Sequence, residues 1–575
     1  MKWTPVVLCC WLLAATVTAY VVLKPKAYVR LNDADGNKRI NSSTLNTLDF
    51  DYVTNLLYVL AHEPARLTVF SLSLDGTPTQ VLEHKFSTAL EGFPLDIEIC
   101  RPLVIGSTPR VAISFQDPAS RSADGRVVFF QPLSFNDKDL VEIQRVTVGP
   151  YPVDLEFAED CSVLIVANKG QATKEGTNIY RDPEGTLTRV QMPPDFSDLS
   201  PITSTTISFA DYFDGPAGGA NLAELLAGNF RSFPVRDPNN GLLSIAQNIE
   251  PEDVLIAEGG RTAYVTLPMN NAVAKVNLFT NQVSEIFPLG NRSWTDYYMD
   301  PSDMDGGVNM RGFNIYSLYQ ARRIEWISQG TREFLITLDS GLFNINHEYG
   351  FMDFERGKTL QSAGVFDTGD QKLESELADD TMLGRLAIST VDGVRLDGRI
   401  ENVFTFGGRG FSIHSGQNLD IRSATVDSIE KVTKQYMPDV FNSAYRSPTS
   451  NPQRDRESTS PFLGPYLQAM TVAEFQDKTV LFLGSGNSGI IYVYVLSADA
   501  TCPQPYFHSL YRAGGKYSTW QTLYDTEAMG DIGINDMRYL EDIDLTPILV
   551  VTSSISNSVS IYHVEEGPFD SDSSV

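Results

Sequence analysis

The stretch QNIEPEDVLIAEGGRTAYVTLPMNNAVAKVNLFTNQVSEIFPLGNRSWTDYYMDPSDMDGGVNMRG, residues 247–312, decides the fold prediction. Its first part predicts four short strands, with turns at Gly259-Gly260 and Asn270-Asn271. The expected strands are Ile249 to Ile256, Thr262 to Leu267, Ala272 to Leu278 and Val283 to Leu289. Four short antiparallel strands in about forty residues are typical of one blade of a β-propeller.

Related patterns recur along the chain, which indicates stacked copies of one supersecondary unit. A Pro-x-Asp motif precedes an alternating apolar strand three times, ending at Asp96, Asp154 and Asp253. Weaker copies lie at 47–74, 324–366, 386–413, 470–496 and 536–564. Eight approximate units predict an all-β propeller of about seven blades, with eight as the alternative. A strand at 20–31 paired with the last C-terminal strands would close the ring and remove its exposed edges.

The domain prediction is a single propeller over residues 20–565. Seven blades need fewer residues than the chain has, so long insertions are expected. One insertion, 193–246, contains an expected helix at 221–226. The other, 428–466, is rich in Pro, Ser, Asn and charge and is expected to be a long loop with little core. Residues 566–575 are expected to form an acidic, disordered tail.

The first nineteen residues have the three parts of a secretory signal peptide: basic Lys2, the apolar run 6–15 and the small-residue site 17–19. The apolar run is too short to span a bilayer of about 30 Å, so we expect no transmembrane segment. The acidic C-terminus lacks the apolar tail of a glycolipid anchor signal. The prediction is secretion to the extracellular matrix, with acceptor sequons for N-glycosylation at Asn41 and Asn291.

Three cysteines remain after the signal peptide, so one internal disulfide is the most that the mature chain can form. Cys100 and Cys161 border equivalent strands in successive repeats, and they are the preferred pair. The state of Cys502 is left open.

The formal net charge of −28 excludes nucleic acid as a partner, because phosphates would be repelled. Two interpretations remain open for such acidity. It can simply keep a secreted protein solvated, or it can give affinity for Ca²⁺ and for calcium-bearing mineral.

The loop Asp300-Pro301-Ser302-Asp303-Met304-Asp305-Gly306-Gly307 is the strongest candidate for a metal site. Calcium takes six to eight oxygen ligands, and closely spaced carboxylates on a glycine-bent loop supply several of them. We predict Asp300, Asp303 and Asp305 as ligands, with Asp303 and Asp305 pointing the same way. The alternative is an Asx-turn that only shapes the loop.

A second acidic group, Glu250, Glu252 and Asp253, stands at the head of the best blade and is also a candidate for metal binding. Strand alternation places Glu250 and Glu252 on one side and Asp253 on the other. If the Pro-x-Asp aspartates are equivalent, they ring one end of a central channel. The alternative is that each one only caps backbone amides near the start of a strand.

The blocks EPEDV, AYVTLPMNNAVAKVNL, PLG and DPSDMDGGVN, in this order, resemble the mesenchyme-specific cell-surface glycoproteins of biomineralising invertebrates and their choice-of-anchor relatives. The resemblance implies a β-propeller and a secreted, non-enzymatic matrix glycoprotein of biomineralisation, with Ca²⁺ or carbonate mineral and other matrix proteins as partners. The chain departs from the family at 458–465, where an Asp-rich stretch is missing. A metal site shared by the family would then be incomplete here.

No linear motif predicts catalysis. The six histidines are scattered, and neither a nucleophile elbow nor a metalloprotease or phosphate-loop motif is present. We therefore name no catalytic or organic-cofactor residues. A calcium-dependent propeller phosphoesterase and an extracellular protein-binding scaffold stay as the alternative functions.

Overall fold

The computed structural model describes residues 20–569 apart from 45, 101–108, 135, 138, 176–178, 194–201, 214–217, 234, 238–240, 258, 347–348, 500 and 543–544. The predicted signal peptide, and residues 570–575 of the predicted tail, lie outside the described residues. Within the described part, the strands form seven four-stranded antiparallel sheets and several smaller ones. The chain is an all-β propeller, as the repeat pattern predicts.

We number the four-stranded sheets as blades 1 to 7 in chain order, each beginning with its innermost strand. Blades 1 to 3 consist of β2 (Asn46–Asp51), β3 (Leu56–Ala61), β4 (Arg66–Leu72) and β5 (Pro78–Lys85); β6 (Pro94–Cys100), β7 (Arg110–Phe115), β8 (Asp124–Phe130) and β9 (Glu142–Pro150); and β10 (Pro152–Phe157), β11 (Val163–Asn168), β14 (Thr186–Gln191) and β15 (Thr203–Ser208).

Blades 4 to 6 follow the same order of strands. They consist of β18 (Val254–Ile256), β19 (Thr262–Leu267), β20 (Ala272–Asn277) and β21 (Gln282–Pro288); β24 (Arg323–Gln329), β25 (Arg332–Asp339), β31 (Gly410–Ser415) and β32 (Ile421–Ala424); and β33 (Leu467–Phe475), β34 (Lys478–Ser485), β35 (Ile491–Leu496) and β36 (Pro505–Tyr511). Two predicted units, 324–366 and 386–413, thus belong to one blade, because a long insertion separates β25 from β31.

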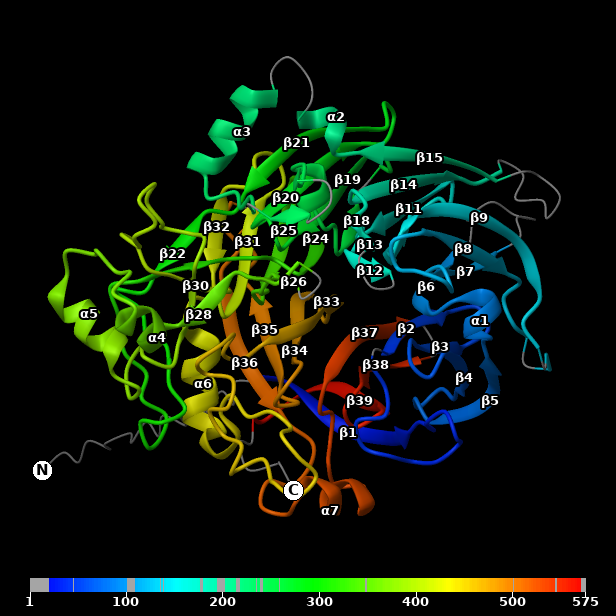
Figure 1. Ribbon diagram of the computed structural model, residues 1–575. Coiled ribbons are helices and arrows are strands. Elements are labelled where there is room, and N and C mark those ends of the chain that lie inside the picture. The colour runs from blue at the N-terminus through cyan, green and yellow to red at the C-terminus, as the bar shows by residue number, and fades with distance from the viewer. Residues whose placement is uncertain are drawn as a thin grey trace, which may run out of the picture.

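Blade 7 joins the two ends of the chain. It consists of β37 (Ile534–Asp542), β38 (Leu545–Ser553) and β39 (Ser558–Gly567), and its outer strand is β1 (Tyr20–Arg30), which pairs antiparallel with β39. Figure 1 shows the blue β1 beside the red C-terminal strands, while the other sheets follow one another around the ring. The N-terminal strand therefore covers an edge of β39 that would otherwise be open to pairing with another chain.

The core is divided among the gaps between neighbouring blades. Ile165 and Leu187 of blade 3, for example, pack with Val265 and Ala274 of blade 4 in one apolar cluster. The second strands β3, β7 and β11 are buried along their whole length, because both faces of each sheet contact another blade. Continuous runs of apolar residues such as VLIVA at 163–167 are the sequence signature of strands buried on both faces.

Residues 254–288, within the stretch 247–312, form blade 4. The strand β19 has the predicted bounds, β20 ends one residue earlier than predicted, and β21 begins and ends one residue earlier than predicted. The first strand is shorter than predicted: a 3₁₀ turn (Ala246–Asn248) precedes Ile249, and β18 begins only at Val254. Pro251 has no N–H to donate to a strand ladder, which explains the late start.

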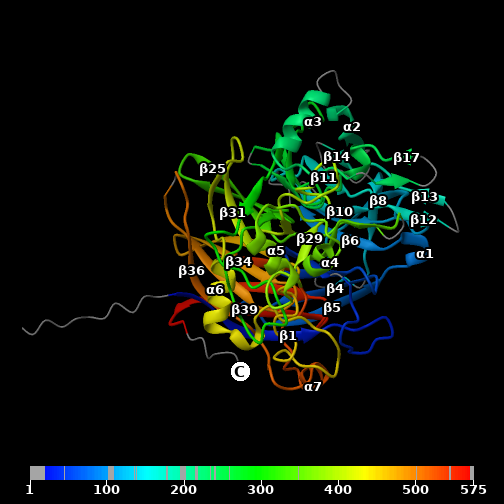
Figure 2. The same cartoon turned by 60° about the vertical axis from the view of Figure 1, so that its left-hand side comes forward.

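All long insertions emerge on one face of the ring. In an antiparallel blade, the connection from strand 2 to strand 3 and the connection to the next blade lie at the same end. The additional elements all occupy these two kinds of connection: α1 (Thr88–Glu91), β12 (Thr173–Glu175), β13 (Ile179–Arg181), α2 (Ala210–Phe213), α3 (Gly218–Ala227), β16 (Arg236–Asp237), β17 (Gly241–Leu242), β22 (Asn291–Ser293), β23 (Tyr316–Leu318), β26 (Ile345–Asn346), β27 (Phe351–Met352), β28 (Phe354–Arg356), α4 (Gly357–Ser362), α5 (Gln371–Ala378), β29 (Ala387–Ser389), β30 (Phe404–Phe406), α6 (Ser428–Tyr436), a 3₁₀ turn (Pro438–Val440) and α7 (Trp520–Asp525). We call this side the insertion face. In Figure 2 its helices α4, α5 and α6, which lie on the left in Figure 1, are turned towards the viewer.

The predicted insertion at 193–246 starts too early. β15 falls inside it and is the outer strand of blade 3, paired with β14. The strand is polar and mostly exposed, so its sequence, TSTTIS, lacks the apolar alternation on which the prediction relied. The expected helix at 221–226 lies within α3.

The expectation of a loop with little core at 428–466 is wrong. The segment begins with α6, and Ile429, Val440 and Phe441 are fully or almost fully buried. Polar residues of the segment are buried as well, among them Glu430, Glu457 and Ser460. The prediction failed because buried hydrogen bonds, rather than apolar contacts alone, hold these residues in place.

The predicted tail also starts too early. β39 continues to Gly567, and the ring of Phe569 packs edge-on against the rings of Tyr436 and Phe507. The acidic residue Glu566, at the start of the predicted tail, is thus part of a paired strand.

Candidate functional site

Three carboxylates of the insertion face form a candidate metal centre. One oxygen atom each of Asp300, Asp305 and Glu457 lies within 4.8 Å of the other two. The aspartates come from the connection between blades 4 and 5, and Glu457 comes from the connection between blades 5 and 6. The site therefore joins two segments that are more than 150 residues apart in sequence.

Four of the six carboxylate oxygens of this centre are buried without a hydrogen-bond partner among the described residues, while the second oxygen of Glu457 lies 3.3 Å from Arg456. Asp300 is fully buried and Glu457 is only 5% exposed. Within the described structure, one oxygen of Asp300, both of Asp305 and one of Glu457 accept no hydrogen bond. Unpaired buried carboxylates are costly, because nothing replaces the water they lose. Burial, together with nearby Glu430, Glu457 and Asp305, raises the pKa of Asp300 to about 8. Burial also raises the pKa of Glu457.

The loop that carries the aspartates is closed at its base by two backbone hydrogen bonds between Met299 and Arg311. Gly306 and Gly307 have φ values of 86° and 155°, so the turn needs residues without a side chain. The amide of Asn309 donates to the backbone oxygens of Asp305 and Gly307, at 3.3 and 3.0 Å. These contacts fix the loop without using its free carboxylate oxygens.

Arg409 lies directly behind the centre. Its guanidinium donates to Glu430 at 2.8 Å and to the backbone oxygens of Asp300 and Ser460 at 3.0 and 2.7 Å. The hydroxyl of Ser460 in turn donates to the second oxygen of Asp300, at 3.1 Å. Arg409 therefore neutralises Glu430 and leaves three carboxylates, a donor set that suits Ca²⁺ with backbone or water oxygens completing the shell.

The structure does not bring Asp303 to this centre. Its carboxylate forms ion pairs with Arg385 at 2.9 Å and with Arg446 at 3.5 Å. Burial alone would raise the pKa of Asp303, but the hydrogen bond and charge of Arg385 outweigh it and lower the pKa. The predicted common direction of Asp303 and Asp305 rested on strand alternation, which does not apply to an irregular loop bent by two glycines.

The second predicted acidic group, Glu250, Glu252 and Asp253, forms ion pairs with basic residues of the protein. Lys169 lies 3.8 Å from Glu250 and 3.0 Å from Glu252, and Arg322 also contacts Glu252, at 2.5 Å. Asp253 faces away from them and pairs with Arg323 at 2.7 Å. The alternation of sides is as predicted, but each carboxylate already has a basic partner.

The Pro-x-Asp aspartates line a central channel of about 420 Å³ and also bind backbone amides. Each one accepts a hydrogen bond from the innermost strand of the next blade, so both alternatives of the sequence analysis apply. The pairs are Asp96 with Leu155 N at 2.9 Å, Asp154 with Val254 N at 2.8 Å and Asp253 with Ile324 N at 2.7 Å, and Asp536 binds Leu48 N in the same way at 2.9 Å.

The sulfur atoms of Cys100 and Cys161 are bonded, with their Cα atoms 5.9 Å apart. This is the pair that the sequence analysis preferred, and it links blade 2 to blade 3. Cys502 is free, and its thiol contacts the backbone oxygen of Arg422. Both sequon asparagines are exposed, and the amide of Asn291 donates to Asn229.

A family model described as the choice-of-anchor I domain matches residues 46–499. The match runs from β2 through β35 and covers most of the chain. The chain belongs to the choice-of-anchor I domain family.

Two proteins with similar sequences show how this family member is related to others. Gigasin-3a of Magallana gigas is 29% identical over 190 residues, which cover 32% of this chain and 66% of that protein. The mesenchyme-specific cell surface glycoprotein of Strongylocentrotus purpuratus is 25% identical over 333 residues, which cover 52% of this chain and 42% of that protein. The chain thus spans less than two thirds of the length of either relative.

Solved structures similar to this choice-of-anchor I chain are more distant. The β-propeller domain of Cps50 (Swd1) from Myceliophteria thermophila is 7% identical, with a TM-score of 0.39, and the match covers 94% of this chain and 99% of that one. The periplasmic gluconolactonase PpgL of Pseudomonas aeruginosa is 11% identical, with a TM-score of 0.33 and coverage of 86% and 99%. No described helix is long and apolar enough to cross a membrane.

Sequence reasoning missed Glu457, Glu430 and the basic partners of the acidic groups. The departure of this chain from the family at 458–465 suggested a depleted metal site. Yet Glu457 immediately precedes that stretch, and Ser460 within it binds Asp300. The charged run Arg454 to Glu457 was a usable signal, but it became meaningful only once the fold placed it beside Asp300.

Proposed function

We propose that this protein is a calcium-binding glycoprotein that acts outside the cell in a mineralised matrix, without an enzymatic role. The observation that carries the proposal is the buried centre of Asp300, Asp305 and Glu457, whose free oxygens have no partner among the described residues. Carboxylate oxygens are the ligands that Ca²⁺ prefers, and three converging carboxylates repel one another unless a cation lies between them.

The burial of the centre favours a structural ion over a catalytic one. A catalytic metal needs an open position for substrate or water, whereas Asp300 is fully buried and Glu457 nearly so. A bound Ca²⁺ would fasten the connection between blades 4 and 5 to the connection between blades 5 and 6. This argument supports a non-enzymatic role over the phosphoesterase alternative.

The extracellular and mineral parts of the proposal rest on the family. One relative is named a cell surface glycoprotein, and the sequence blocks quoted above resemble proteins of biomineralising invertebrates. The net charge of −28 is compatible with a calcium-rich surface, and Asn41 and Asn291 are the proposed glycosylation sites. Carbonate mineral and other matrix proteins are the proposed partners.

Calorimetric titration of the calcium-free protein with Ca²⁺ tests the metal centre. We expect one site in the range of about 0.1–1 mM that is typical of extracellular modules. Asp300→Asn and Glu457→Gln should each weaken it at least tenfold. Asp303→Asn is the matched control on the same loop, because Asp303 is paired with Arg385, and it should leave the site intact.

The titrations distinguish the ligands predicted from sequence, which include Asp303, from those of the structure, which include Glu457. Loss of binding in Asp303→Asn, with binding retained in Glu457→Gln, would support the ligands predicted from sequence and contradict the centre seen here. Absence of any site at about 10 mM Ca²⁺ would refute direct calcium binding. Antibody labelling of tissue should place the protein beside forming mineral, and labelling confined to cell interiors would refute the matrix role.

A further inference from the structure

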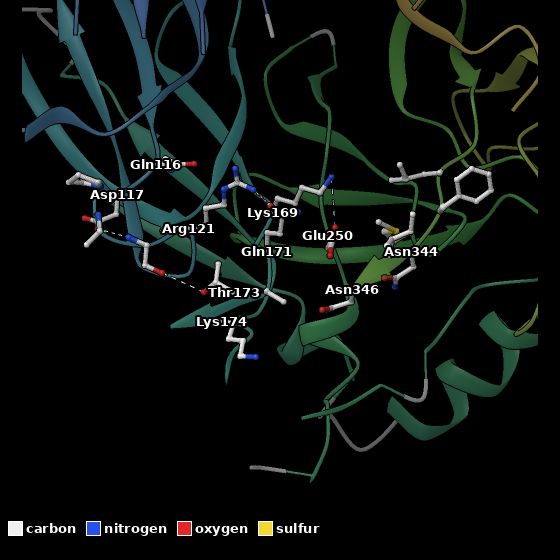
Figure 3. A pocket seen from close by; sticks show the side chains of 18 residues that line it. Gln116, Asp117, Arg121, Lys169, Gln171, Thr173, Lys174, Glu250, Asn344 and Asn346 are labelled. Atoms are coloured by element: carbon white, nitrogen blue, oxygen red, sulfur yellow. Dashed lines mark hydrogen bonds and ion pairs between the residues drawn. The ribbon is translucent and has the colours of Figure 1, made fainter. Parts of the chain in front are cut away.

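A cavity of about 900 Å³ opens on the insertion face, separate from the carboxylate centre. Its walls come from the connections between strands 2 and 3 of blades 2, 3, 4 and 5, together with Glu250. Figure 3 shows two groups of side chains facing each other across it, with Arg121, Gln171 and Lys174 on one side and Asn344 and Asn346 on the other. Loops of this kind, gathered at one end of a rigid scaffold, commonly form binding sites.

The cavity is locally cationic on a strongly acidic protein. Its lining contains Arg121, Lys169 and Lys174 against the two carboxylates Asp117 and Glu250, whereas the whole chain has a net charge of −28. Lys169 is already paired with Glu250 and Glu252. Arg121 and Lys174 are exposed, and in the described structure neither is paired with a carboxylate. These two cations are therefore available to an anionic ligand.

The remaining lining suits hydroxyl groups. Four side-chain amides face the cavity, from Gln116, Gln171, Asn344 and Asn346. An amide both donates and accepts hydrogen bonds, as a sugar hydroxyl does. Gln116 is only 6% exposed, and its side-chain oxygen has no hydrogen-bond partner within the described structure, so it is an acceptor without a donor.

Apolar side chains supply the rest of the wall. Phe343 and Met269 line the cavity and offer surface to the C–H faces of a sugar ring. The cavity volume lies in the range of about 300–1,000 Å³ that is usual for ligand sites, which leaves room for more than one ring.

We propose that this cavity binds an acidic saccharide. Arg121 and Lys174 hold its carboxylate or sulfate groups, and the four amides pair with its hydroxyls. Arg121 is held by the side-chain oxygen of Gln171 at 3.3 Å and lies over the ring of Tyr151, and Lys174 lies over the ring of Tyr180. Both cations are thus positioned, and neither is paired with a carboxylate of the described residues. The site is independent of the calcium centre, because it shares no residue with it.

Calorimetry with alginate hexasaccharide, a polyuronate, tests the proposal, with neutral maltohexaose as the comparison. The titration is done in chelator, so that Ca²⁺ bridging between carboxylates cannot contribute. We expect the polyuronate to bind and the neutral sugar to bind at least tenfold more weakly. The double variant Arg121→Ala, Lys174→Ala should weaken the polyuronate at least tenfold. The control variant Arg422→Ala, Lys434→Ala removes two exposed cations elsewhere on the protein and should have no effect.

A second pair of measurements distinguishes a saccharide from any polyanion. Asn344→Ala should weaken the polyuronate severalfold but leave the binding of a hexaglutamate peptide unchanged. Binding of the peptide as tight as that of the polyuronate would overturn the saccharide assignment. Unchanged polyuronate binding in the Arg121, Lys174 variant would overturn the site itself. Unchanged circular dichroism of each variant shows that any loss is not caused by unfolding.

Discussion

Carboxylates that are close together in the sequence have very different partners in the folded protein. Asp303 and Asp305 are two residues apart, yet the first is paired with Arg385 and the second has no partner among the described residues. Arg385 belongs to a segment about eighty residues away from Asp303 in sequence. Whether a carboxylate is free for a metal is therefore set by the cations that the fold brings to it, and Glu457 rather than Asp303 completes the centre.

Arg231 forms buried ion pairs between two insertions, and its substitution tests how much these pairs stabilise the fold. Its guanidinium lies 2.8 Å from Asp353 and 2.9 Å from Asp392, with the Arg231 and Asp353 side chains fully buried. Arg231→Met should lower the free energy of unfolding by about 3–5 kcal/mol, because it leaves buried charge unpaired. Arg395→Met, which removes exposed ion pairs with Asp367 and Asp397, should cost about 0–1 kcal/mol. Equal denaturation midpoints for the two variants would contradict this account.

Strands of neighbouring blades are joined by side chain to backbone hydrogen bonds as well as by apolar packing. The aspartates at the start of β6, β10 and β18 each bind an N–H of the next innermost strand. Burial, with Asp253 and Asp96 close by, raises the pKa of Asp154. The repeated Pro-x-Asp motif thus has an architectural role, since it sets the register between one blade and the next.

Substitution of Asp154 tests whether this motif acts through its hydrogen bond or through its charge. Asp154→Ala should lower the free energy of unfolding by about 1–3 kcal/mol, because the N–H of Val254 loses its acceptor. Asp154→Asn keeps an acceptor oxygen and should cost much less. Urea denaturation measures both. If alanine and asparagine have the same effect, the aspartate acts through its charge and not through the hydrogen bond.

The whole ring concentrates acidic side chains in its channel. Glu98, Glu156 and Glu325 occupy equivalent positions of β6, β10 and β24 and face the same cavity as the aspartates. Burial, with Glu325 close to Glu156 and Asp253 close to Glu325, raises the pKa of Glu156 and of Glu325 to about 8. This repulsion arises only where several blades meet, because each blade contributes only one or two of the groups.

The channel predicts a pH dependence of stability. The folded pKa values of Glu156 and Glu325 lie above the ordinary 4.5, so the folded chain binds more protons than the unfolded chain between about pH 4.5 and 8. Stability contributed by these groups is present at the low end of that window and is lost as the pH rises through it. The variant Glu156→Gln, Glu325→Gln should be more stable than the parent at about pH 8.5, by on the order of 1–2 kcal/mol.

Chemical denaturation at several pH values checks this prediction. The variant should show a flatter dependence between about pH 5.5 and 8.5. Glu285→Gln, at an exposed position of β21, is the control and should leave the slope unchanged. A variant that loses stability at high pH would mean that the glutamates make favourable contacts in their ionised form.

Local sequence was sufficient for most of the architecture. Short apolar strands, glycine and asparagine turns and the repeated Pro-x-Asp motif predicted an all-β propeller, and the bounds of β19 followed from its residues alone. Where the local signal was polar, the prediction failed: β15 and the buried 428–466 segment lack the apolar periodicity by which strands and cores are recognised.

The sequence by itself determined the propeller and pointed to the loop containing Asp300, because strand patterning and loop composition are local properties. Only the tertiary structure decided which carboxylates converge. It placed Glu457 beside Asp300 and Asp305, Arg385 beside Asp303, and Lys169 beside Glu250 and Glu252. Electrostatic and hydrogen-bonding partners act over a few ångströms in space, and in a β-propeller those neighbours come from segments far apart in the chain.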